Sequence, residues 1–321
     1  MYEQYKADPN SVTPSWQEFF ADYGLDKSAV ITGRSAAPTG GTPAAPSAPP
    51  AAAPGAAAPA APAAPAAATP PAAAPSAPPQ GEPIRGAAAR IVANMEASLS
   101  VPTATSFREV PARLLEVNRR TINAYLQRTR GGKVSFTHLI GYAVVRAIAD
   151  AMPVMNSSYT VDESGTPRVI HHEHVNLGIA VDVEKADGSR TLVVPSIKAA
   201  DTLDFQGFVD AYEELIRKVR SNKVTPDDFA GTTVSLTNPG TVGTVQSVPR
   251  LMPGQGVIVG VGTIDYPTAF QAADPATLAD VGVSKVVTLT STYDHRIIQG
   301  AESGLFLKKI HELLLGEDDF Y

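Results

Sequence analysis

The chain has 321 residues, of which 44% are hydrophobic and 18% are charged, enough for one large globular domain together with additional segments. Its formal net charge is −6, and Lys and Arg are scattered along it, which argues against a nucleic-acid-binding protein. It contains no cysteine, which excludes disulfides, thiolate metal sites and a cysteine nucleophile.

Targeting and membrane segments are not visible in the sequence. No apolar run approaches the roughly 18 residues that a membrane-spanning helix needs. The N-terminus, which begins Met1, Tyr2, Glu3, Gln4, has neither the basic start nor the apolar core of a signal peptide. We therefore expect a cytoplasmic protein that acts without a membrane.

Residues 1–24 are rich in aromatic side chains and end at a glycine. Pro14 and Ser15 precede a short helical pattern that contains Trp16, Phe19 and Phe20. Segments shorter than ~40 residues rarely bury enough surface to fold alone. The pattern predicts a small helical docking segment.

Residues 25–84 form a linker, and its part from 36 to 80 is almost entirely alanine and proline. Proline at this density prevents a helix despite the alanines. An extended chain at ~3.1 Å per residue could separate its ends by on the order of 100 Å. Two interpretations remain open, a semi-rigid swinging tether and an ordinary disordered spacer.

Helical periodicity begins at residue 85. Ile84, Ala88, Ile91, Met95 and Leu99 recur at steps of three and four residues, which places them on one face of a helix. Further helices are predicted at residues 111–129, 137–151 with Ser135 or Thr137 as the N-cap, 204–220 and 301–315.

Strand-like segments occupy most of the remaining domain. Four of them are separated by turn-forming residues and are expected to be neighbours in a sheet, namely 159–161, 168–170, 175–183 and 191–197. Three more strands are predicted at residues 232–237, 257–261 and 285–291. Helices packed on a mixed sheet predict a two-layer α/β domain.

The strongest chemical signal is the octapeptide at residues 293–300, Tyr-Asp-His-Arg-Ile-Ile-Gln-Gly, which joins a predicted strand to the last helix. Strand ends are places where functional side chains collect. The tripeptide Asp294, His295, Arg296 does not by itself distinguish a catalytic histidine from ordinary surface charge.

The octapeptide resembles the Tyr-Asp-His-Arg-x-x-Asp-Gly signature of the acyltransferase components of 2-oxo acid dehydrogenases, which share a fold with chloramphenicol acetyltransferase. Further family features follow in the expected order at residues 176–181, 192–195, 231–240 and 256–260. The resemblance covers residues 85–316. It implies a chloramphenicol-acetyltransferase-like domain and a homotrimer whose active sites lie between neighbouring subunits.

The resemblance implies transfer of an acyl group from dihydrolipoamide to coenzyme A, with His295 as general base. An imidazole with a pKa near 6.5 is largely free to accept a proton from a thiol with a pKa near 8.5. It also implies that the Thr237 hydroxyl stabilises the oxyanion, with Asp294, Arg296, Asn238 and Gln299 as supporting residues. Without the resemblance, Thr237 would be interpreted as a strand residue before a turn.

Gln299 departs from the family pattern, which usually has an aspartate at this position. The family's carboxylate is thought to anchor the site through an ion pair, and an uncharged amide cannot form one. The departure puts the rigidity of the site and its rate in doubt. One alternative function is therefore a catalytically weak trimerising scaffold, and a second is an acyltransferase acting on a small molecule.

Two other motifs are weak. The run His171, His172, Glu173, His174 resembles a metal cluster, but neighbouring side chains on an extended chain point to opposite faces, so no metal is expected. Gly254 and Gly256 resemble a dinucleotide-binding loop but precede a strand instead of joining a strand to a helix.

The N-terminal 20 residues resemble the N-terminal segment of thiamine-dependent 2-oxoglutarate dehydrogenase. Both resemblances together match the actinobacterial family of fused 2-oxoglutarate dehydrogenase/decarboxylases, Gln299 included. This match implies succinyl transfer within the tricarboxylic acid cycle, with a lipoyl domain and dihydrolipoamide dehydrogenase as partners from a 2-oxo acid dehydrogenase complex. It also implies that residues 317–321 begin a missing domain, which alone would bind thiamine diphosphate and Mg²⁺, so the chain is expected to be a fragment.

Overall fold

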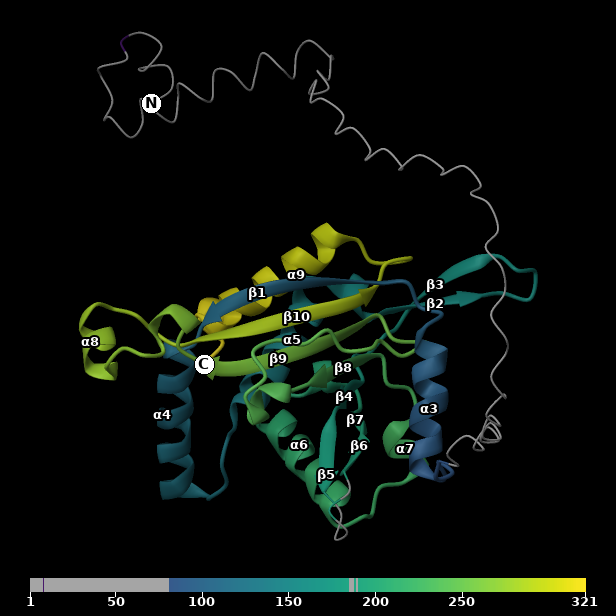
Figure 1. Ribbon diagram of the computed structural model, residues 1–321, viewed down its shortest axis with the longest axis horizontal. Helices are drawn as coiled ribbons and strands as arrows, with labels where there is room; N and C mark the ends of the chain where they lie inside the picture. The colour runs from purple at the N-terminus through teal and green to yellow at the C-terminus, as the bar shows by residue number, and fades with distance from the viewer. Residues whose placement is uncertain (1–7, 9–80, 185–187, 189) are drawn as a thin grey trace, which may run out of the picture. The chain divides into compact units, whose positions relative to one another are not determined.

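The computed structural model describes residue 8 and residues 81–184, 188 and 190–321 (Figure 1). Apart from Asp8, the predicted docking segment and the Ala/Pro block up to residue 80 lie outside the described residues. Within the described residues, no helix combines the length and the apolar character needed to cross a membrane.

A mixed sheet forms one layer of the domain, with the strand order β1-β10-β9-β8-β4-β7. The pairs β1–β10, β10–β9 and β4–β7 are antiparallel, whereas β9–β8 and β8–β4 are parallel. The predicted mixed sheet is therefore confirmed. Its strands are β1 (Thr103–Pro111), β4 (Leu177–Ile179), β7 (Ser196–Ile197), β8 (Val234–Thr237), β9 (Val257–Asp265) and β10 (Val286–Asp294).

Strand β1 was not predicted from the sequence. It pairs with β10 in continuous register from Thr103 opposite Asp294 to Pro111 opposite Val286. The strand lies at the edge of the sheet, and only Val110 of its nine residues is buried. An edge strand of this kind lacks the regular alternation of apolar and polar residues by which strands are recognised.

The prediction that four consecutive strands are neighbours is confirmed within two pairs, 159–161 with 168–170 and 175–183 with 191–197, but the two pairs do not share one sheet. β2 (Ser157–Val161) and β3 (Pro167–His171) form a separate hairpin, as do β5 (Val181–Glu184) and β6 (Arg190–Val193). The chain leaves the main sheet after β4, where the Ala180 N–H still donates to the Leu236 carbonyl. It returns at β7 after Pro195, which has no N–H to continue the β6 ladder.

Helices other than α3 form the second layer. The five long helices of the domain are α3 (Ala87–Ser98), α4 (Arg113–Thr129), α5 (Phe136–Asp150), α6 (Phe205–Arg220) and α9 (Gly300–Leu314), close to their predicted bounds. Short helices are α7 (Pro226–Phe229), α8 (Pro275–Asp280), η2 (Pro153–Asn156), η3 (Ala200–Thr202), η4 (Pro239–Val242), η5 (Thr268–Phe270) and η6 (Glu317–Asp319). Ser135 is the N-cap of α5, because its hydroxyl accepts the His138 N–H at 3.3 Å.

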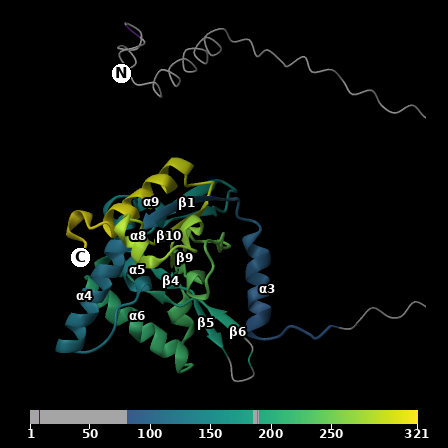
Figure 2. The same ribbon diagram turned by 60° about the vertical axis from the view of Figure 1, so that its left-hand side comes forward.

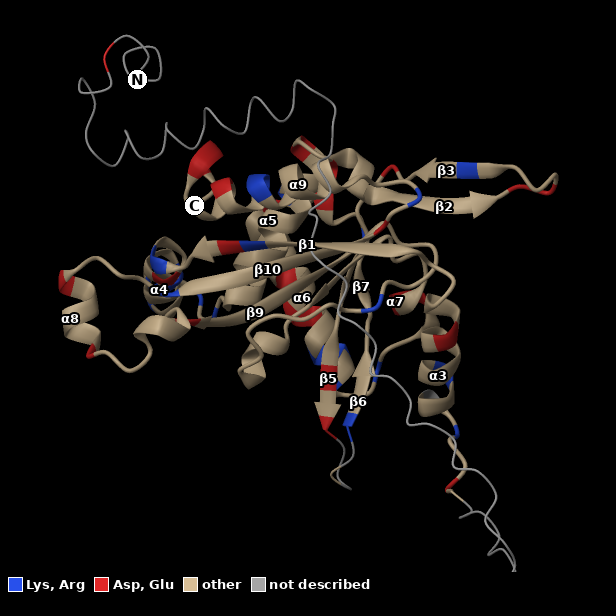
Figure 3. Cartoon of the chain, turned by 45° about the horizontal axis from the view of Figure 1, so that its top comes forward, with Lys and Arg blue, Asp and Glu red and all other residues tan. Residues whose placement is uncertain are grey.

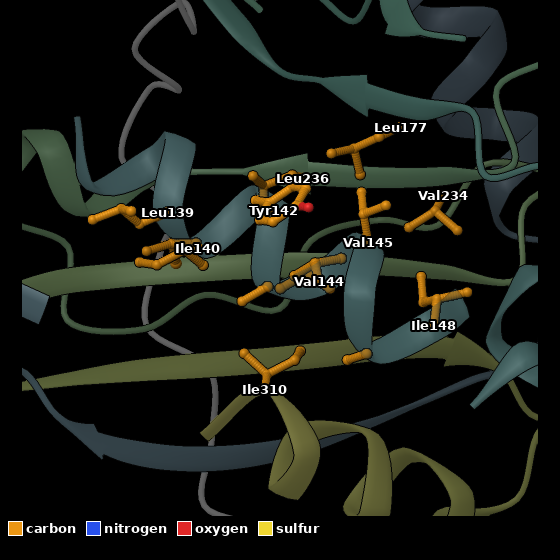
Figure 4. Packing of buried hydrophobic residues seen from close by; sticks show 14 of the residues in the cluster. Leu139, Ile140, Tyr142, Val144, Val145, Ile148, Leu177, Val234, Leu236 and Ile310 are labelled. Carbon is orange, nitrogen blue, oxygen red and sulfur yellow. The ribbon is translucent and has the colours of Figure 1, made fainter. Parts of the chain in front are cut away.

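Helix α5 lies at the centre of the core. Ten of its fifteen residues are buried, and it packs against α4, α6 and α9. Figure 4 shows α5 side chains between Leu177, Val234 and Leu236 of the sheet and Ile310 of α9. A helix that is apolar on most of its surface must be covered on all sides, and the two-layer arrangement provides this cover.

Helix α3 lies apart from the α/β layers in both views of the ribbon (Figures 1 and 2). The apolar side chains that predicted this helix remain largely accessible in the single chain, with Leu99 68% and Met95 39% exposed. Its amphipathic pattern is therefore real, but the apolar face is not covered by the described part of the same chain.

Glycines allow the segment that follows β8 to cross β9 at close range. A Cβ on Gly262 would lie 1.9 Å from the Val245 carbonyl oxygen, whereas a Cβ on Gly304, in the middle of α9, would meet nothing within 4 Å. We expect Gly262→Ala to lower the free energy of unfolding by about 3 kcal/mol, because the crossing segments must move apart.

Gly304→Ala is the matched control, and its expected effect has the opposite sign, a gain of about 0.5–1 kcal/mol from helix propensity. Urea denaturation of both variants measures the two changes. Equal stability of the two variants would contradict the close crossing.

Candidate active site

His295 directly follows β10, where the strand turns toward α9. Its backbone N–H donates to the Pro102 carbonyl at 2.9 Å, which holds the turn against the start of β1. Its ring Nδ1 lies 3.1 Å from the Ile298 carbonyl oxygen. A carbonyl only accepts hydrogen bonds, so Nδ1 carries the proton in the neutral ring and Nε2 keeps a free lone pair. His295 is exposed in the single chain, and its Nε2 has no hydrogen-bond partner within the described part of the chain.

Asp294 and Arg296, on either side of His295, form a bidentate ion pair. Arg296 donates from Nε to Asp294 Oδ1 at 2.8 Å and from Nη2 to Oδ2 at 2.6 Å, and its backbone N–H reaches Oδ1 at 3.1 Å. Asp294 is only 2% exposed, so its charge requires this partner. The hydrogen bonds with Asp294 raise the pKa of Arg296. The Asp294–Arg296 ion pair therefore constrains the short backbone segment that carries His295.

Tyr159 of β2 completes the environment of this ion pair. The guanidinium carbon of Arg296 lies 3.7 Å from the centre of the Tyr159 ring, within the range of a cation–π contact. The two residues are far apart in the sequence, Tyr159 in the β2–β3 hairpin and Arg296 in the turn between β10 and α9. Sequence analysis did not identify Tyr159, and no motif around it indicates this role.

Two further residues border His295. The Tyr293 ring lies edge-on to the imidazole, with 5.5 Å between the ring centres. Gln299 is the N-cap of α9, and its backbone N–H donates to Glu302 Oε2 at 2.7 Å. Gln299 is exposed in the single chain. Its position at the helix start fixes the backbone around the Ile298 carbonyl that orients the histidine.

Thr237 and Asn238 lie at the end of β8. Thr237 is half-buried, and Asn238 donates from Nδ2 to the Thr137 hydroxyl at 2.8 Å, which ties the strand end to the start of α5. The Asn238 Oδ1 atom is buried and has no hydrogen-bond partner within the described part of the chain. A cavity of about 510 Å³ adjoins Asn238, and its lining includes Lys133, His138 and Arg220.

The structure does not bring Thr237 and His295 together within one chain. Thr237 is level with Gly260 of β9, which is level with Thr290 of β10. His295 lies five residues beyond Thr290, or about 17 Å along the strand at ~3.3 Å per residue. The predicted site residues therefore form two separate groups. His295 lies with Asp294 and Arg296 at the end of β10, whereas Thr237 and Asn238 lie at the end of β8, level with the middle of β9 and β10.

His138, beside the cavity, is a buried neutral histidine. Its Nδ1 accepts the Ser135 N–H at 2.8 Å, so the proton lies on Nε2, which is 3.2 Å from Glu213 Oε1 without the alignment of a hydrogen bond. Burial lowers the pKa of His138 from 6.5 to about 4. As the pH falls, the unfolded chain binds this proton before the folded chain does.

This difference predicts a loss of stability in acid. The contribution of His138 is complete above about pH 6.5 and is lost between that pH and about 4. From pH 7 to about pH 4.5, the wild type should lose about 2.5 kcal/mol more than His138→Gln, which retains a helix-capping side chain. Urea denaturation at both pH values measures this difference, and equal losses would contradict it.

The histidine run at residues 171–174 does not converge on one point. His171 Nδ1 lies 2.9 Å from the Ser157 hydroxyl, His172 Nε2 lies 3.0 Å from the Ser158 hydroxyl, and His174 Nδ1 lies 3.0 Å from Asp201 Oδ2. Among the residues that the structure describes, no group of three or more His, Asp or Glu side chains could hold a metal ion. These histidines instead connect the β2–β3 hairpin and its base.

Lys and Arg residues are interspersed with Asp and Glu residues along the described elements (Figure 3). The hairpin β5–β6 is an example, because Arg190 pairs there with Asp182 and Glu184. This distribution agrees with the scattered Lys and Arg of the sequence and gives no element the character of a polyphosphate-binding surface.

The comparisons with known proteins identify the class of protein. The family model described as the 2-oxoacid dehydrogenases acyltransferase (catalytic domain) matches residues 76–318, and the chain therefore belongs to this family. A second model, the 2-oxoglutarate dehydrogenase N-terminus, matches residues 1–26. The chain is 47% identical, over its whole length, to the multifunctional 2-oxoglutarate metabolism enzyme of Mycobacterium sp. (strain JLS), and it spans 28% of that relative.

Solved structures agree with this assignment. A probable dihydrolipoamide acetyltransferase of Listeria monocytogenes has a TM-score of 0.63 and 26% identity, with 74% of this chain and 94% of that chain covered. The dihydrolipoamide acetyltransferase of Azotobacter vinelandii, studied for a serine, a histidine and an asparagine in its catalytic mechanism, has a TM-score of 0.61, 25% identity, and coverage of 75% and 96%. A cubic core of a pyruvate dehydrogenase multienzyme complex has a TM-score of 0.60, 26% identity, and the same coverage. The predicted α/β acyltransferase fold is confirmed.

Proposed function

We propose that this domain transfers an acyl group from dihydrolipoamide to coenzyme A, with His295 as the general base. The observation that carries the proposal is the geometry of His295 at the strand end. Its Nδ1 is bound to the Ile298 carbonyl, its Nε2 has no hydrogen-bond partner within the described part of the chain, and the residue is exposed. This is the tautomer that a base needs in order to take a proton from a thiol.

The reaction needs no group beyond the two substrates. His295 Nε2 takes the proton from the coenzyme A thiol, and the thiolate forms a bond to the thioester carbonyl carbon of the acyl-dihydrolipoamide. The resulting oxyanion accepts a hydrogen bond from the Thr237 hydroxyl, which would contribute about 3 kcal/mol. The carbon–sulfur bond to dihydrolipoamide then breaks, and the leaving sulfur takes the proton back from the imidazolium. Acyl-coenzyme A and dihydrolipoamide are the products.

The separation of Thr237 from His295 supports a site built from two chains. A hydroxyl about 17 Å away along the sheet cannot reach the oxyanion beside its own histidine, so the donor must come from a neighbouring copy. In a closed ring, the part of each chain that carries His295 contacts the part of the next chain that carries Thr237. We propose a homotrimer, and the accessible apolar side chains of α3 would provide part of its contacts.

The similarity to multifunctional 2-oxoglutarate metabolism enzymes supports a succinyl group as the acyl substrate. In the longer protein, residues 1–24 would dock, residues 25–84 would link and residues 85–316 would form the acyltransferase, with a thiamine-dependent domain from residue 317 onward. Thiamine diphosphate and Mg²⁺ would be bound by that further domain, and a lipoyl domain with dihydrolipoamide dehydrogenase would be the partners of this one.

Gln299 is compatible with catalysis on this proposal. The Azotobacter vinelandii study names an asparagine four positions after its histidine, and Gln299 stands four positions after His295. Both side chains are uncharged amides, so an ion pair at this position is not required for the reaction. The absence of a carboxylate is nevertheless the observation that favours the alternative, a catalytically weak trimerising scaffold.

The test is a direct assay of the purified protein with succinyl-dihydrolipoamide and coenzyme A, following succinyl-coenzyme A formation. Turnover with this pair but not with a small hydroxyl acceptor would support the proposal. An intact oligomer without turnover would leave the scaffold function instead. Acetyl-dihydrolipoamide, assayed in parallel, tests whether the enzyme prefers the succinyl group.

A further inference from the structure

The β2–β3 hairpin contributes little to the core of the domain. All five residues of β3 are exposed, and Val161 and Val169 are close to half exposed. Figure 1 shows the hairpin extending beyond the end of the main sheet. Its contribution to folding is therefore small, and its contacts with the rest of the chain are concentrated at its base and at Tyr159.

The base of the hairpin is fixed against the segment that carries His295. The Asn156 side-chain amide donates to the carbonyl oxygens of His172 and His174 at 3.1 and 3.0 Å. Gly256 packs so closely on this base that a Cβ would lie 2.4 Å from the Met155 carbonyl oxygen. The carbonyl of the same Gly256 accepts the Asp294 N–H at 3.1 Å. The hairpin and the His295 turn are thus joined through one glycine.

Tyr159 provides a second connection, through side chains. Its ring supports the face of the Arg296 guanidinium, while the edge of that guanidinium is bonded to both carboxylate oxygens of Asp294. Arg296 keeps 30% of its side chain exposed, so without the ring it would gain freedom to exchange Asp294 for water. Asp294 has no such freedom, because its side chain is only 3% exposed.

We propose that Tyr159 is a positioning residue for acyl transfer, which rests on the proposed function of this domain. The ring holds Arg296 on Asp294, and the pair fixes the backbone on both sides of His295. This constraint keeps the imidazole Nδ1 on the Ile298 carbonyl and points Nε2 toward the thiol. Small misplacements of a base raise the barrier without weakening substrate binding, so Tyr159 acts on kcat and not on KM.

The test compares Tyr159→Leu with Tyr159→Phe, which retains the aromatic face. Val169→Ala is the matched control, because Val169 lies directly opposite Tyr159 in the same hairpin and is 47% exposed. A cation–π contact of this kind corresponds to a factor of between about 3 and 30. We expect kcat to fall by that factor in Tyr159→Leu, with both KM values unchanged, and to stay near wild type in Tyr159→Phe and Val169→Ala.

A double-mutant cycle identifies the path of the effect. Arg296→Lys keeps the charge but loses the bidentate hydrogen bonding to Asp294. If Tyr159 acts through Arg296, adding Tyr159→Leu to Arg296→Lys should reduce kcat little further. Full additivity of the two losses, or a Tyr159→Leu enzyme with wild-type kcat, would overturn the proposal.

A spectroscopic measurement separates this proposal from the function on which it rests. The NMR signal of the His295 ring is assigned by its loss in His295→Ala. Its chemical shift depends on the position of the ring relative to the edge-on Tyr293. The signal should move in Tyr159→Leu and stay in place in Val169→Ala, whether or not the protein turns over substrate. A wild type without turnover would refute the acyltransferase function, whereas an unmoved His295 signal would refute the positioning role.

Discussion

Replacement of His295 with alanine is expected to lower kcat for succinyl-coenzyme A formation by about 10²- to 10⁴-fold, the usual contribution of a general base. KM for coenzyme A should change little, because the imidazole acts on the thiol proton and adds little to substrate binding. The measurement is a steady-state assay on samples whose oligomeric mass matches that of the wild type.

His174→Ala is the control for this experiment. His174 is exposed and paired with Asp201, and it lies outside both groups of site residues. Its removal should leave kcat unchanged. If His295→Ala retained wild-type turnover in an intact oligomer, the base would be another group and the proposed mechanism would be wrong.

The second large effect is expected from mixing two inactive variants. Thr237→Ala alone should lower kcat by about 10²- to 10³-fold through loss of the oxyanion donor. When Thr237→Ala and His295→Ala chains are both present in one trimer, about one third of the interfaces should combine an intact histidine with an intact threonine. Activity of the mixed trimers should therefore return to about one third of wild type.

Co-expression with two different affinity tags, followed by purification through both, yields the mixed oligomers for this assay. Thr237→Ser, which keeps the hydroxyl, replaces Thr237→Ala in the control and should be active without mixing. Mixed oligomers that remain inactive would show that His295 of one chain and Thr237 of its neighbour do not share one site.

The sequence was sufficient for the elements that depend on local signals. The helices were found by their apolar periodicity, and the start of α5 by the capping residue Ser135, whose hydroxyl accepts the His138 N–H of the first turn. The octapeptide around His295 was found because its residues are consecutive in the chain. Local capping and periodicity need no knowledge of the partners, so they can be read before the fold is known.

Strand partners and site geometry depend on contacts between distant segments. The edge strand β1 lacks a regular apolar pattern, and the β2–β3 and β5–β6 hairpins differ from main-sheet strands only in what they pair with. Tyr159 lies next to Arg296, and Thr137 next to Asn238, because tertiary packing brings them there. No local pattern encodes such pairs, since their attraction acts only after the sheet has formed.

The amino-acid sequence by itself indicated the class of protein, because the groups proposed as base and oxyanion donor, on His295 and Thr237, stand within recognisable motifs. Only the tertiary structure decided how those groups are arranged. The parallel pairing of β8 with β9 and the antiparallel pairing of β9 with β10 make β8 and β10 run in opposite directions, so Thr237 at the end of β8 is level with Thr290 in the middle of β10. Strand direction is a property of the folded sheet and not of either motif, and it is what separates Thr237 from His295 within the chain.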